Sequence, residues 1–470
     1  MPDRVPEGHS LGVRLVGDDL QAPCIDGLQR TYLSLDAAAS TSALPAVAER
    51  VADFLPRYSS VHRGAGWKSQ LATAEYEEAR AAALAFAGKT DDRDVAVICR
   101  NTTEAVNQLA YRLRLAPDDV VVTTVVEHHA NLLPWARLAH RRYVECGADG
   151  TFDAADVAAT LDAAIHEGPL PRILTITGAS NVTGWMPPID DIVAAAHHRG
   201  VPVLVDAAQL AAHRPLPGGA DFLAWSGHKM YAPYGGGVLV GPRSAFETGD
   251  PFLAGGGAVD LVDLDEVVWT DPPEREEAGS PNVMGAVALH AAIDELAGIG
   301  WPAIVAHDDA LALRLRHGLA AIDGVRLLGP GLGTPTLPLA TFVVEGVHHA
   351  LVAARLSAEH AIGVRHGCFC AHPYLLRLLG LDGAEIASYR SAVLRGDRRD
   401  VPGAVRASAG LSTTAADVDR FLAAVADIAG GGDPPVPYDQ DPETGDYWPR
   451  TDDADWASAA RRPGTSCARG

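Results

Sequence analysis

The sequence predicts an α/β fold, with a large mixed, mostly parallel sheet covered by helices and a smaller α+β domain after it. Short continuous runs of apolar, largely β-branched residues alternate with helix-like segments between residues 95 and 240. Such runs are typical of strands buried on both faces, as in sheets with helices on both sides. From about residue 300 helical sequence dominates, which indicates a second, smaller domain. A chain of 470 residues has room for about two to four domains.

The elements of the first part follow in order. Residues 1–34 contain several prolines and are expected to form an irregular N-terminal segment, with a short strand at 32–36. Apolar spacing predicts a helix over 44–54 and a longer, alanine-rich helix over 70–87. In the large domain, residues 35–299, strands are expected at 95–99, 120–126, 172–177, 201–205 and 237–240, with helices from 103 and over 189–198.

The second domain, residues 300–430, begins with helical sequence over 302–322. It continues with a strand at 340–344 and helices at 349–360 and 415–429. Beyond residue 430 the composition changes to Gly, Pro, Asp and Arg, which is typical of an extended or disordered tail over 431–470. The alternative is that its aromatic side chains fix the tail to the surface: Tyr438, Tyr447, Trp448 and Trp456.

The composition excludes several classes of protein. The formal net charge of −22 argues against a nucleic-acid-binding protein, because such proteins carry basic surfaces. Met1–Ser10 has no basic region followed by an apolar stretch, and no apolar run is long enough to span a bilayer, so neither a signal peptide nor a membrane protein is predicted. The six cysteines are scattered except for one close pair and are interpreted as reduced thiols. We therefore expect a cytoplasmic protein.

Polar side chains follow several predicted strands at the point where each strand ends, which is where open α/β sheets bind ligands. Thr102 and Thr103, in the segment 101–104, combine two hydroxyl groups with the free amides of a helix N-terminus. This pattern indicates a phosphate cradle or a simple helix cap. His128 and His129 are adjacent in an extended segment and point to opposite faces, which favours one ring stacked on a flat cofactor over metal chelation. No metal site is predicted.

Three further strand ends favour a pyridine cofactor. Asn181 suits a ring oxygen or a substrate carboxylate, with a turn asparagine as the alternative. Asp206 ends a strand, where a buried carboxylate needs a partner such as a protonated pyridine nitrogen; the alternative is an aspartate that caps a helix. With the pyridine nitrogen on Asp206, Gln209 would reach the phenolic oxygen of the cofactor. Lys229 closes a Ser-Gly-His turn after the apolar run 222–225, where it is well placed to hold an aldehyde as a Schiff base, with a solvated loop lysine as the alternative. Together these residues fit pyridoxal phosphate.

The order of these motifs resembles that of class V aminotransferase-fold enzymes, and within them the group II cysteine desulfurases and selenocysteine lyases. The resemblance runs from about residue 32 to 430 and implies a pyridoxal-phosphate-dependent transferase of fold type I. It rests on Leu-Asp-x-Ala-Ala-Ser, Val-His-Arg-Gly, Thr-Thr-Glu, Glu-His-His-Ala-Asn, Ser-Asn-Val, Val-Asp-x-Ala-Gln and Ser-Gly-His-Lys.

The resemblance implies a role for each of these residues. It makes Lys229 the Schiff-base lysine, stacks His128 on the ring and places Asp206 on the pyridine nitrogen. Ser280, in a segment that crosses to the partner subunit in the family, is implied to bind the phosphate of the other protomer, so a homodimer is expected. The other cofactor ligands are Asn181 and Gln209 near the ring oxygen, and Thr103, Ser226 and His228 on the phosphate beside Thr102.

The second half of the chain supplies the reaction type. Residues 364–373 match the family nucleophile loop Arg-x-Gly-x-x-Cys-Ala-x-Pro, which makes Cys370 the reactive thiol. The resemblance implies conversion of L-cysteine, or L-selenocysteine, to alanine, with a persulfide on Cys370 that passes to an acceptor protein or pathway enzyme. Arg406 matches the arginine that binds the substrate carboxylate, and Arg365 is placed in the same substrate site. His366 or His372, in the same loop, is a candidate for moving protons.

Three features depart from the family pattern. The Cys-Phe-Cys pair resembles molybdenum-cofactor sulfurases, so that Cys368 either relays sulfur or forms a disulfide with Cys370. The segment 379–401 is longer and more charged than usual and is interpreted as a lid or an acceptor-docking surface, and the tail 431–470 is additional.

Two alternative functions remain open. One is another reaction of the same cofactor, namely C–S lysis, transamination or epimerisation in specialised metabolism. The other is a non-catalytic regulatory partner, which retention of Lys229 disfavours.

Overall fold

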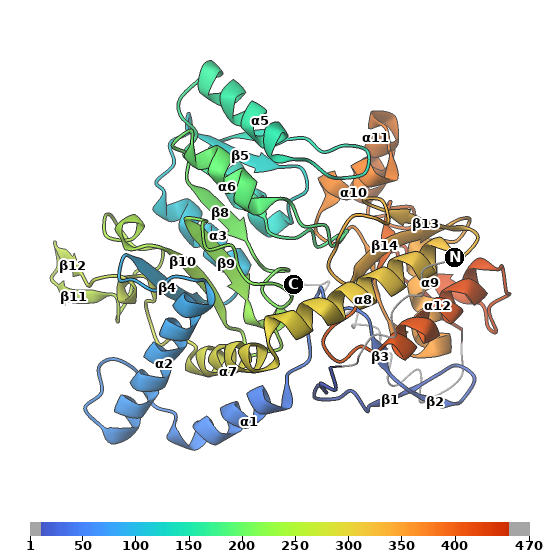
Figure 1. The fold of residues 1–470 in the computed structure, drawn as a ribbon, viewed down its shortest axis with the longest axis horizontal. Coiled ribbons are helices and arrows are strands. Elements are labelled where there is room, and N and C mark those ends of the chain that lie inside the picture. Colours follow the sequence, from blue (N-terminus) through green and yellow to red (C-terminus); the bar gives the residue numbers. More distant parts are fainter. Residues whose placement is uncertain (1–10, 451–470) are drawn as a thin grey trace.

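The computed structural model describes residues 11–450, and its larger part is built on a seven-stranded sheet (Figure 1). The strands are β4 (Asp94–Cys99), β5 (Val120–Thr124), β6 (His140–Val144), β7 (Ile173–Thr177), β8 (Val203–Asp206), β9 (Phe222–Ser226) and β10 (Gly237–Pro242). Their order is β4-β10-β9-β8-β7-β5-β6. All neighbouring pairs from β9 to β6 are parallel, whereas β10 is antiparallel to both β4 and β9. The predicted mixed, mostly parallel sheet is confirmed.

Helices cover both faces of this sheet, which explains the continuous apolar runs. Successive side chains of a strand face opposite sides. In β4, Ala96 and Ile98 belong to one hydrophobic core, and Val95 and Val97 belong to another. The helices of the first core are α1 (Pro45–Phe54), α2 (Trp67–Phe86), α5 (Ala154–Glu167), α6 (Ile189–His197) and α7 (Val283–Ile299), and those of the second are α3 (Thr102–Arg112) and α4 (Leu133–Ala136).

The smaller part is an antiparallel sheet with helices packed on it, as predicted. The 20-residue helix α8 (Trp301–Ala320) connects the two parts, running from below the large sheet to the small one (Figure 1). The strand order is β13-β14-β17-β16. Its elements are β13 (Val325–Leu328), β14 (Leu339–Val344), β16 (Arg365–Gly367), β17 (Ala404–Ser408), α9 (His349–His360), α10 (His372–Leu379), α11 (Gly383–Leu394) and α12 (Ala415–Ala429).

The N-terminal segment contains more regular structure than the sequence indicates. β1 (Gln21–Pro23) and β2 (Gln29–Thr31) form a short antiparallel hairpin. β3 (Leu33–Ser34) pairs in parallel with β15 (Ile362–Gly363), so this segment packs on the smaller part of the molecule.

Residues 431–450 also differ from the expected extended tail, because they form a hairpin. β18 (Tyr438–Gln440) pairs with β19 (Tyr447–Pro449), and the Tyr438 hydroxyl donates to Glu359 Oε1 of α9 at 2.9 Å. The rest of the predicted tail, including Trp456, lies outside the described residues.

Another hairpin, β11 (Val259–Val262) with β12 (Val267–Trp269), extends from the large part at the left of Figure 1. Within residues 11–450, no single helix is long and apolar enough to cross a membrane. The pair α7 and α8 meets that criterion together on length and composition, with a bend of 83° between them.

Candidate active site

The carboxyl ends of five strands meet at one edge of the large sheet, because β4, β5, β7, β8 and β9 all run in the same direction. A cavity of about 180 Å³ lies at this edge and also reaches the smaller part of the molecule. The predicted residues that line it are Thr102, Thr103, His128, Asn181, Asp206, Gln209, Ser226, His228, Lys229, Arg365, Cys370 and Arg406. Ser280, which was expected to bind a cofactor phosphate, does not line this cavity, and neither do Cys368, His366 and His372.

The N-terminus of α3 forms one wall of the cavity. The Thr102 hydroxyl lies 2.7 Å from Ser226 Oγ, which also accepts a hydrogen bond from the Thr102 amide at 2.8 Å. The Asn101 side chain caps the helix by accepting from the Glu104 amide at 3.0 Å. Thr103 is exposed to the cavity, and no partner for its amide or hydroxyl is found among residues 11–450. A helix N-terminus with free donors favours an anion.

His128 presents an uncharged ring to the cavity. Its Nδ1 accepts from the Ala130 amide at 3.0 Å, which leaves the proton on Nε2 and fixes the ring. Burial, and then the nearby Lys229, lower the pKa of His128 to about 3. The adjacent His129 does not line the cavity, and its ring stacks on that of His372, with ring centroids 5.1 Å apart. His129 begins the 3-10 helix His129–Asn131, and its ring centroid lies 6.3 Å from that of His128, so the expected extended segment with the two rings on opposite faces is not formed.

Behind His128 lies Glu127, a buried carboxylate that sequence reasoning did not single out. Burial raises its pKa to about 8, although three donors stabilise the charge. Its oxygens accept from the Thr124 hydroxyl at 2.7 Å, the Thr177 amide at 3.0 Å and the Asn131 side chain at 2.6 Å. Glu127 therefore holds the carboxyl ends of β5 and β7 together beneath the cavity.

Asp206 and Gln209 follow β8 on the cavity floor. Asp206 is buried, and in the described chain only the Ala208 amide, at 3.0 Å, donates a hydrogen bond to its carboxylate. Burial raises the pKa of Asp206, so the site favours a cationic partner for this carboxylate. The Gln209 amide nitrogen donates to the Ala38 carbonyl at 2.7 Å, which links the floor to the segment after β3.

Lys229 ends the short 3-10 helix Gly227–Lys229 that follows β9. Burial lowers the pKa of its amine to about 8, and Asp206 opposes that shift. A substantial fraction of the amine is thus unprotonated near neutral pH. This is the state that attacks an aldehyde.

Arg406, from β17, enters the cavity from the smaller part of the molecule. It donates to the Asn181 carbonyl at 2.8 Å and to Asp36 Oδ1 at 3.0 Å. Its Nε is buried without a partner in the described part of the chain. Arg365 lies 3.6 Å from the other Asp36 oxygen. Asp36, which the sequence interpretation left without a role, therefore positions both arginines.

The loop between β16 and α10 presents Cys370 to the cavity. Cys370 is exposed and Cys368 half-buried, and both thiols are free. Asn181 Nδ2 donates to the Phe369 carbonyl at 2.6 Å, so the amide expected near a ring oxygen also attaches this loop to the large part. The Phe369 ring is buried, with the Arg406 guanidinium 5.1 Å from its centroid.

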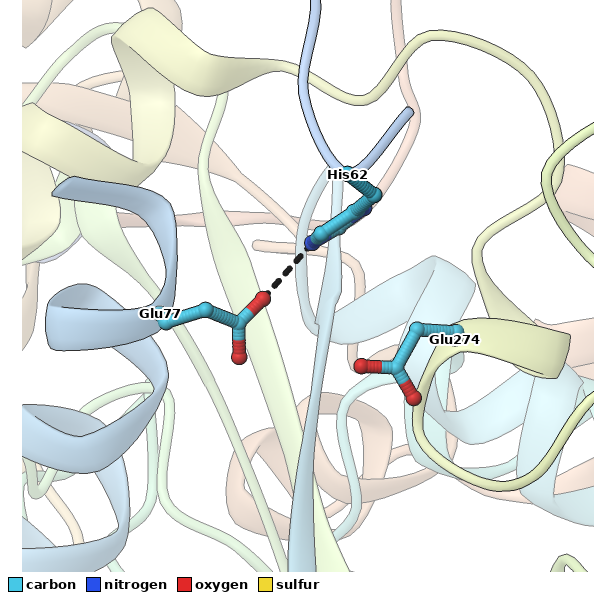
Figure 2. Close-up of side chains that lie close together, drawn as sticks. All are labelled: His62, Glu77 and Glu274. Atoms are coloured by element: carbon cyan, nitrogen blue, oxygen red, sulfur yellow. Dashed lines mark hydrogen bonds and ion pairs between the residues drawn. The ribbon is translucent and has the colours of Figure 1, made fainter. Parts of the chain in front are cut away.

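Ser280 belongs to a separate surface hollow that it shares with His62, Arg80 and Glu274. Figure 2 shows His62, Glu77 and Glu274 there, with His62 Nε2 2.6 Å from Glu77 Oε1. Their spacing is compatible with metal ligands, but Arg80 Nη1 already donates to Glu77 at 2.8 Å and to Glu274 at 3.0 Å. Because the guanidinium neutralises these carboxylates, we assign no metal to them.

Comparison with known proteins agrees with this geometry. The family model for aminotransferase class-V matches residues 33–421. A probable cysteine desulfurase of Pseudomonas putida is 35% identical over 417 residues, covering 86% of this chain and 95% of the relative. The probable cysteine desulfurase of Pseudomonas aeruginosa is 37% identical over 407 residues, covering 84% and 92%.

Solved structures give the same result. The apo cysteine desulfurase of Thermococcus onnurineus superposes with a TM-score of 0.74 at 31% identity, covering 85% of this chain and 95% of the other. The S-sulfonic acid form of the Escherichia coli cysteine desulfurase CsdA superposes with a TM-score of 0.70 at 33% identity, with the same coverage. Because the family model and the relatives span most of the chain, the protein belongs to the aminotransferase class-V family.

Proposed function

We propose that this protein is a homodimeric, pyridoxal-phosphate-dependent cysteine desulfurase. It converts L-cysteine to L-alanine and retains the sulfur as a persulfide on Cys370 for an acceptor. The curated relatives and solved structures that carry the name cysteine desulfurase support this activity.

The cavity fits the cofactor in three respects. The N-terminus of α3, with Thr103, suits the phosphate. The buried Asp206 carboxylate, with one backbone donor, suits a protonated ring nitrogen. The neutral His128 ring suits a flat aromatic face, and the Lys229 amine suits the aldehyde. Ser226 and His228 line the same wall and are assigned to the phosphate.

The substrate carboxylate is assigned to Arg406. Its buried Nε has no partner in residues 11–450, and a guanidinium binds a carboxylate through two parallel hydrogen bonds. Arg365, beside it on Asp36, adds a second positive charge. Asn181, whose carbonyl accepts from Arg406, completes the same wall.

When bound, the cofactor supplies an electron-withdrawing ring that weakens the carbon–sulfur bond of cysteine. Lys229 would take the proton from Cα, since its lowered pKa makes it a base near neutral pH. The Cys370 thiolate forms a bond to the substrate sulfur as that sulfur leaves carbon. Cysteine and the Cys370 thiol thereby become alanine and a Cys370 persulfide, with all atoms accounted for.

The observation that carries this proposal is the placement of Cys370. The cavity that Cys370 lines also contains Lys229 and Arg406, so a substrate bound by both would lie near the thiol. The other reactions considered for this cofactor, lysis, transamination and epimerisation, do not use such a thiol.

Replacing Cys370 by alanine tests the proposal. We expect alanine formation from cysteine to fall by at least about 100-fold, because loss of a covalent nucleophile costs orders of magnitude in rate. The yellow absorbance of the bound cofactor should remain, because Cys370 is not assigned to it. Cys146→Ala, which removes a half-buried free thiol elsewhere in the chain, should leave the rate unchanged. Undiminished sulfur release by Cys370→Ala would instead support a lyase.

Transfer of the sulfur to an acceptor protein or pathway enzyme and a cytoplasmic location stay predictions of the sequence. Comparing alanine formation from L-cysteine and L-selenocysteine shows which of the two amino acids is the better substrate.

A further inference from the structure

Cys368 is a second thiol beside the proposed nucleophile, and the proposed function gives it no task. The two cysteines lie in one tight turn, in which the Ala371 amide donates to the Cys368 carbonyl at 3.0 Å. The central residues, Phe369 and Cys370, have φ angles of 54° and 56°. Positive φ at both central positions is the mark of a type I′ turn, which normally uses Asn or Gly.

This unfavourable turn is held in place from outside. Asn181 Nδ2 donates to the Phe369 carbonyl at 2.6 Å, and the His129 amide donates to the Cys370 carbonyl at 2.8 Å. The buried Phe369 ring, next to the Arg406 guanidinium, adds a third attachment. These contacts hold the strained turn in one conformation, which fixes the backbone positions of Cys368 and Cys370 relative to each other.

The turn also brings the two thiols within bonding reach. The Cα atoms of Cys368 and Cys370 are two residues apart, so their separation is at most twice about 3.8 Å. A turn shortens this Cα–Cα distance toward the roughly 4.4–6.8 Å that a disulfide spans. The backbone amide of Cys370 stabilises the Cys368 thiolate, so the Cys368 sulfur lies close to the main chain of Cys370. Cys370 lines the cavity and Cys368 does not. Cys368 is therefore a neighbouring thiol that does not line the cavity in which the Cys370 persulfide would form.

We propose that Cys368 is a resolving thiol that attacks the inner sulfur of the Cys370 persulfide, forms a Cys368–Cys370 disulfide and releases the outer sulfur as hydrosulfide. The bond between the two persulfide sulfurs breaks, and its electron pair leaves with the outer sulfur. The Cys368 proton goes to water. The Cys368 sulfur is oxidised, the outer sulfur is reduced and the oxidation state of the Cys370 sulfur does not change, so no external oxidant is needed. This inference rests on the proposed function, which supplies the persulfide.

The consequence is a competition between the acceptor and Cys368. Burial raises the pKa of Cys368, and only the thiolate attacks, so resolution is slow at neutral pH and accelerates as the pH rises. Without an acceptor, each subunit completes one turnover, releases sulfide and stops as a disulfide until a dithiol reduces it.

The test uses the cofactor-loaded enzyme without reductant or oxygen, mixed with one equivalent of L-cysteine per subunit and then quenched with an alkylating agent. Alanine, free sulfide and the mass of the peptide that holds both cysteines are measured at several pH values. We expect the wild type to release one sulfide per alanine and to lose two hydrogens from this peptide, faster at higher pH. Cys368→Ser should instead retain one additional sulfur on Cys370. Cys146→Ser, which removes a half-buried thiol whose pKa burial also raises, should behave as the wild type.

The outcomes separate this inference from the proposed function. Alanine without a disulfide, with the persulfide stable on Cys370 of the wild type, overturns the resolving role alone. An additional sulfur found on Cys368 shows a relay and also overturns it. Absence of alanine from the wild type overturns the proposed function and this inference with it. As a measurement that needs no turnover, a thiol oxidant added to the cofactor-free protein should link Cys368 to Cys370; failure to do so contradicts the proposed proximity.

Discussion

Burial lowers the pKa of the Lys229 amine and the Asp206 carboxylate raises it, and their balance sets the pH at which the amine reacts with an aldehyde. Its amine has a pKa of about 8 instead of the ordinary 10.5. Below pH 8 the amine is protonated, so the rate at which cofactor-free protein captures the aldehyde should fall about tenfold per pH unit. Above pH 8 the rate should level off. Stopped-flow absorbance measures it.

Asp206 provides the control for this prediction. Because Asp206 raises the pKa of Lys229, Asp206→Asn should shift the rising limb of the rate profile to lower pH. Lys229→Arg should show no capture. If the capture rate of the wild type kept rising up to about pH 10.5 before it levelled off, the lowered pKa of Lys229 would be contradicted.

Glu277 is a buried carboxylate whose three partners come from two other elements, α2 and β4. It accepts from the Tyr76 hydroxyl at 2.5 Å, from Arg80 Nη2 at 2.8 Å and from the Ile98 amide at 2.6 Å. Glu277→Leu leaves these buried donors without an acceptor, so we expect the free energy of unfolding to fall by about 3 kcal/mol. The exposed pair of Arg142 and Glu167 is the control, and Glu167→Leu should cost less than about 1 kcal/mol. Equal shifts of the urea midpoint in the two variants would contradict the assigned role of Glu277.

Sequence reasoning found most of the site residues because they directly follow apolar strands. It left Asp36 without a role, since its pairing with Arg406 depends on contacts between residues 370 positions apart. It did not foresee the left-handed turn either, because neither Phe369 nor Cys370 is a residue that favours positive φ.

Helix α9, strand β16 and the hairpin of β18 and β19 meet at a group of histidines. His349 Nε2 donates to the Val401 carbonyl at 3.1 Å, and its ring lies near those of His348 and His366. Asp446, from the hairpin, lies 3.3 Å from His366 Nε2. The added C-terminal hairpin therefore contacts the strand that leads to the nucleophile loop.

This group predicts a loss of stability in acid. Burial, followed by the neighbouring His348, lowers the pKa of His349 to about 3, below its value of about 6.5 in the unfolded chain. Between these values the unfolded state binds more protons, so stability falls as the pH drops below about 6.5, by up to about 1.4 kcal/mol per pH unit. His349→Gln keeps a donor for Val401 but does not titrate, and its stability should change less over this range. Parallel pH profiles of the two proteins in urea unfolding would contradict the prediction.

At the level of elements, the predicted strands of the large sheet have continuous apolar sequences, and the missed elements lack such a sequence, even where, as in β17, every residue is buried. β6 is an edge strand, and its arginine-rich sequence, from His140 to Val144, is mostly exposed. α11 has no fully buried residue, so its sequence shows no apolar stripe. β17 has Arg406 at its centre, so its sequence does not show the continuous apolar pattern of a buried strand. In each case the tertiary environment, not the local pattern, determines the element.

The hairpin of β11 and β12 and the segment that carries Ser280 are connected, and their features fit contact with a second copy of the chain. The exposed side chains of Leu261 and Leu264 lie on the hairpin of β11 and β12, and Leu264 is fully exposed. The Gly279 amide donates to the Gly256 carbonyl at 2.7 Å, which connects the base of this hairpin to the segment that carries Ser280. Ser280 is exposed and lies outside the cavity of its own chain. These features support the proposal that Ser280 serves the cofactor of the partner subunit.

Mixed dimers test this arrangement. Ser280→Ala should weaken cofactor binding about tenfold, since a hydrogen bond to a charged group contributes about 1.5–3 kcal/mol. In a dimer of one Ser280→Ala subunit and one Lys229→Ala subunit, purified with two tags, the remaining Lys229 belongs to the subunit that lacks Ser280. If Ser280 acts across the interface, that site receives the native serine from the other subunit, and absorbance titration should show native affinity. Weak binding in the mixed dimer would place Ser280 on its own subunit's cofactor, and a monomer in solution would contradict the whole arrangement.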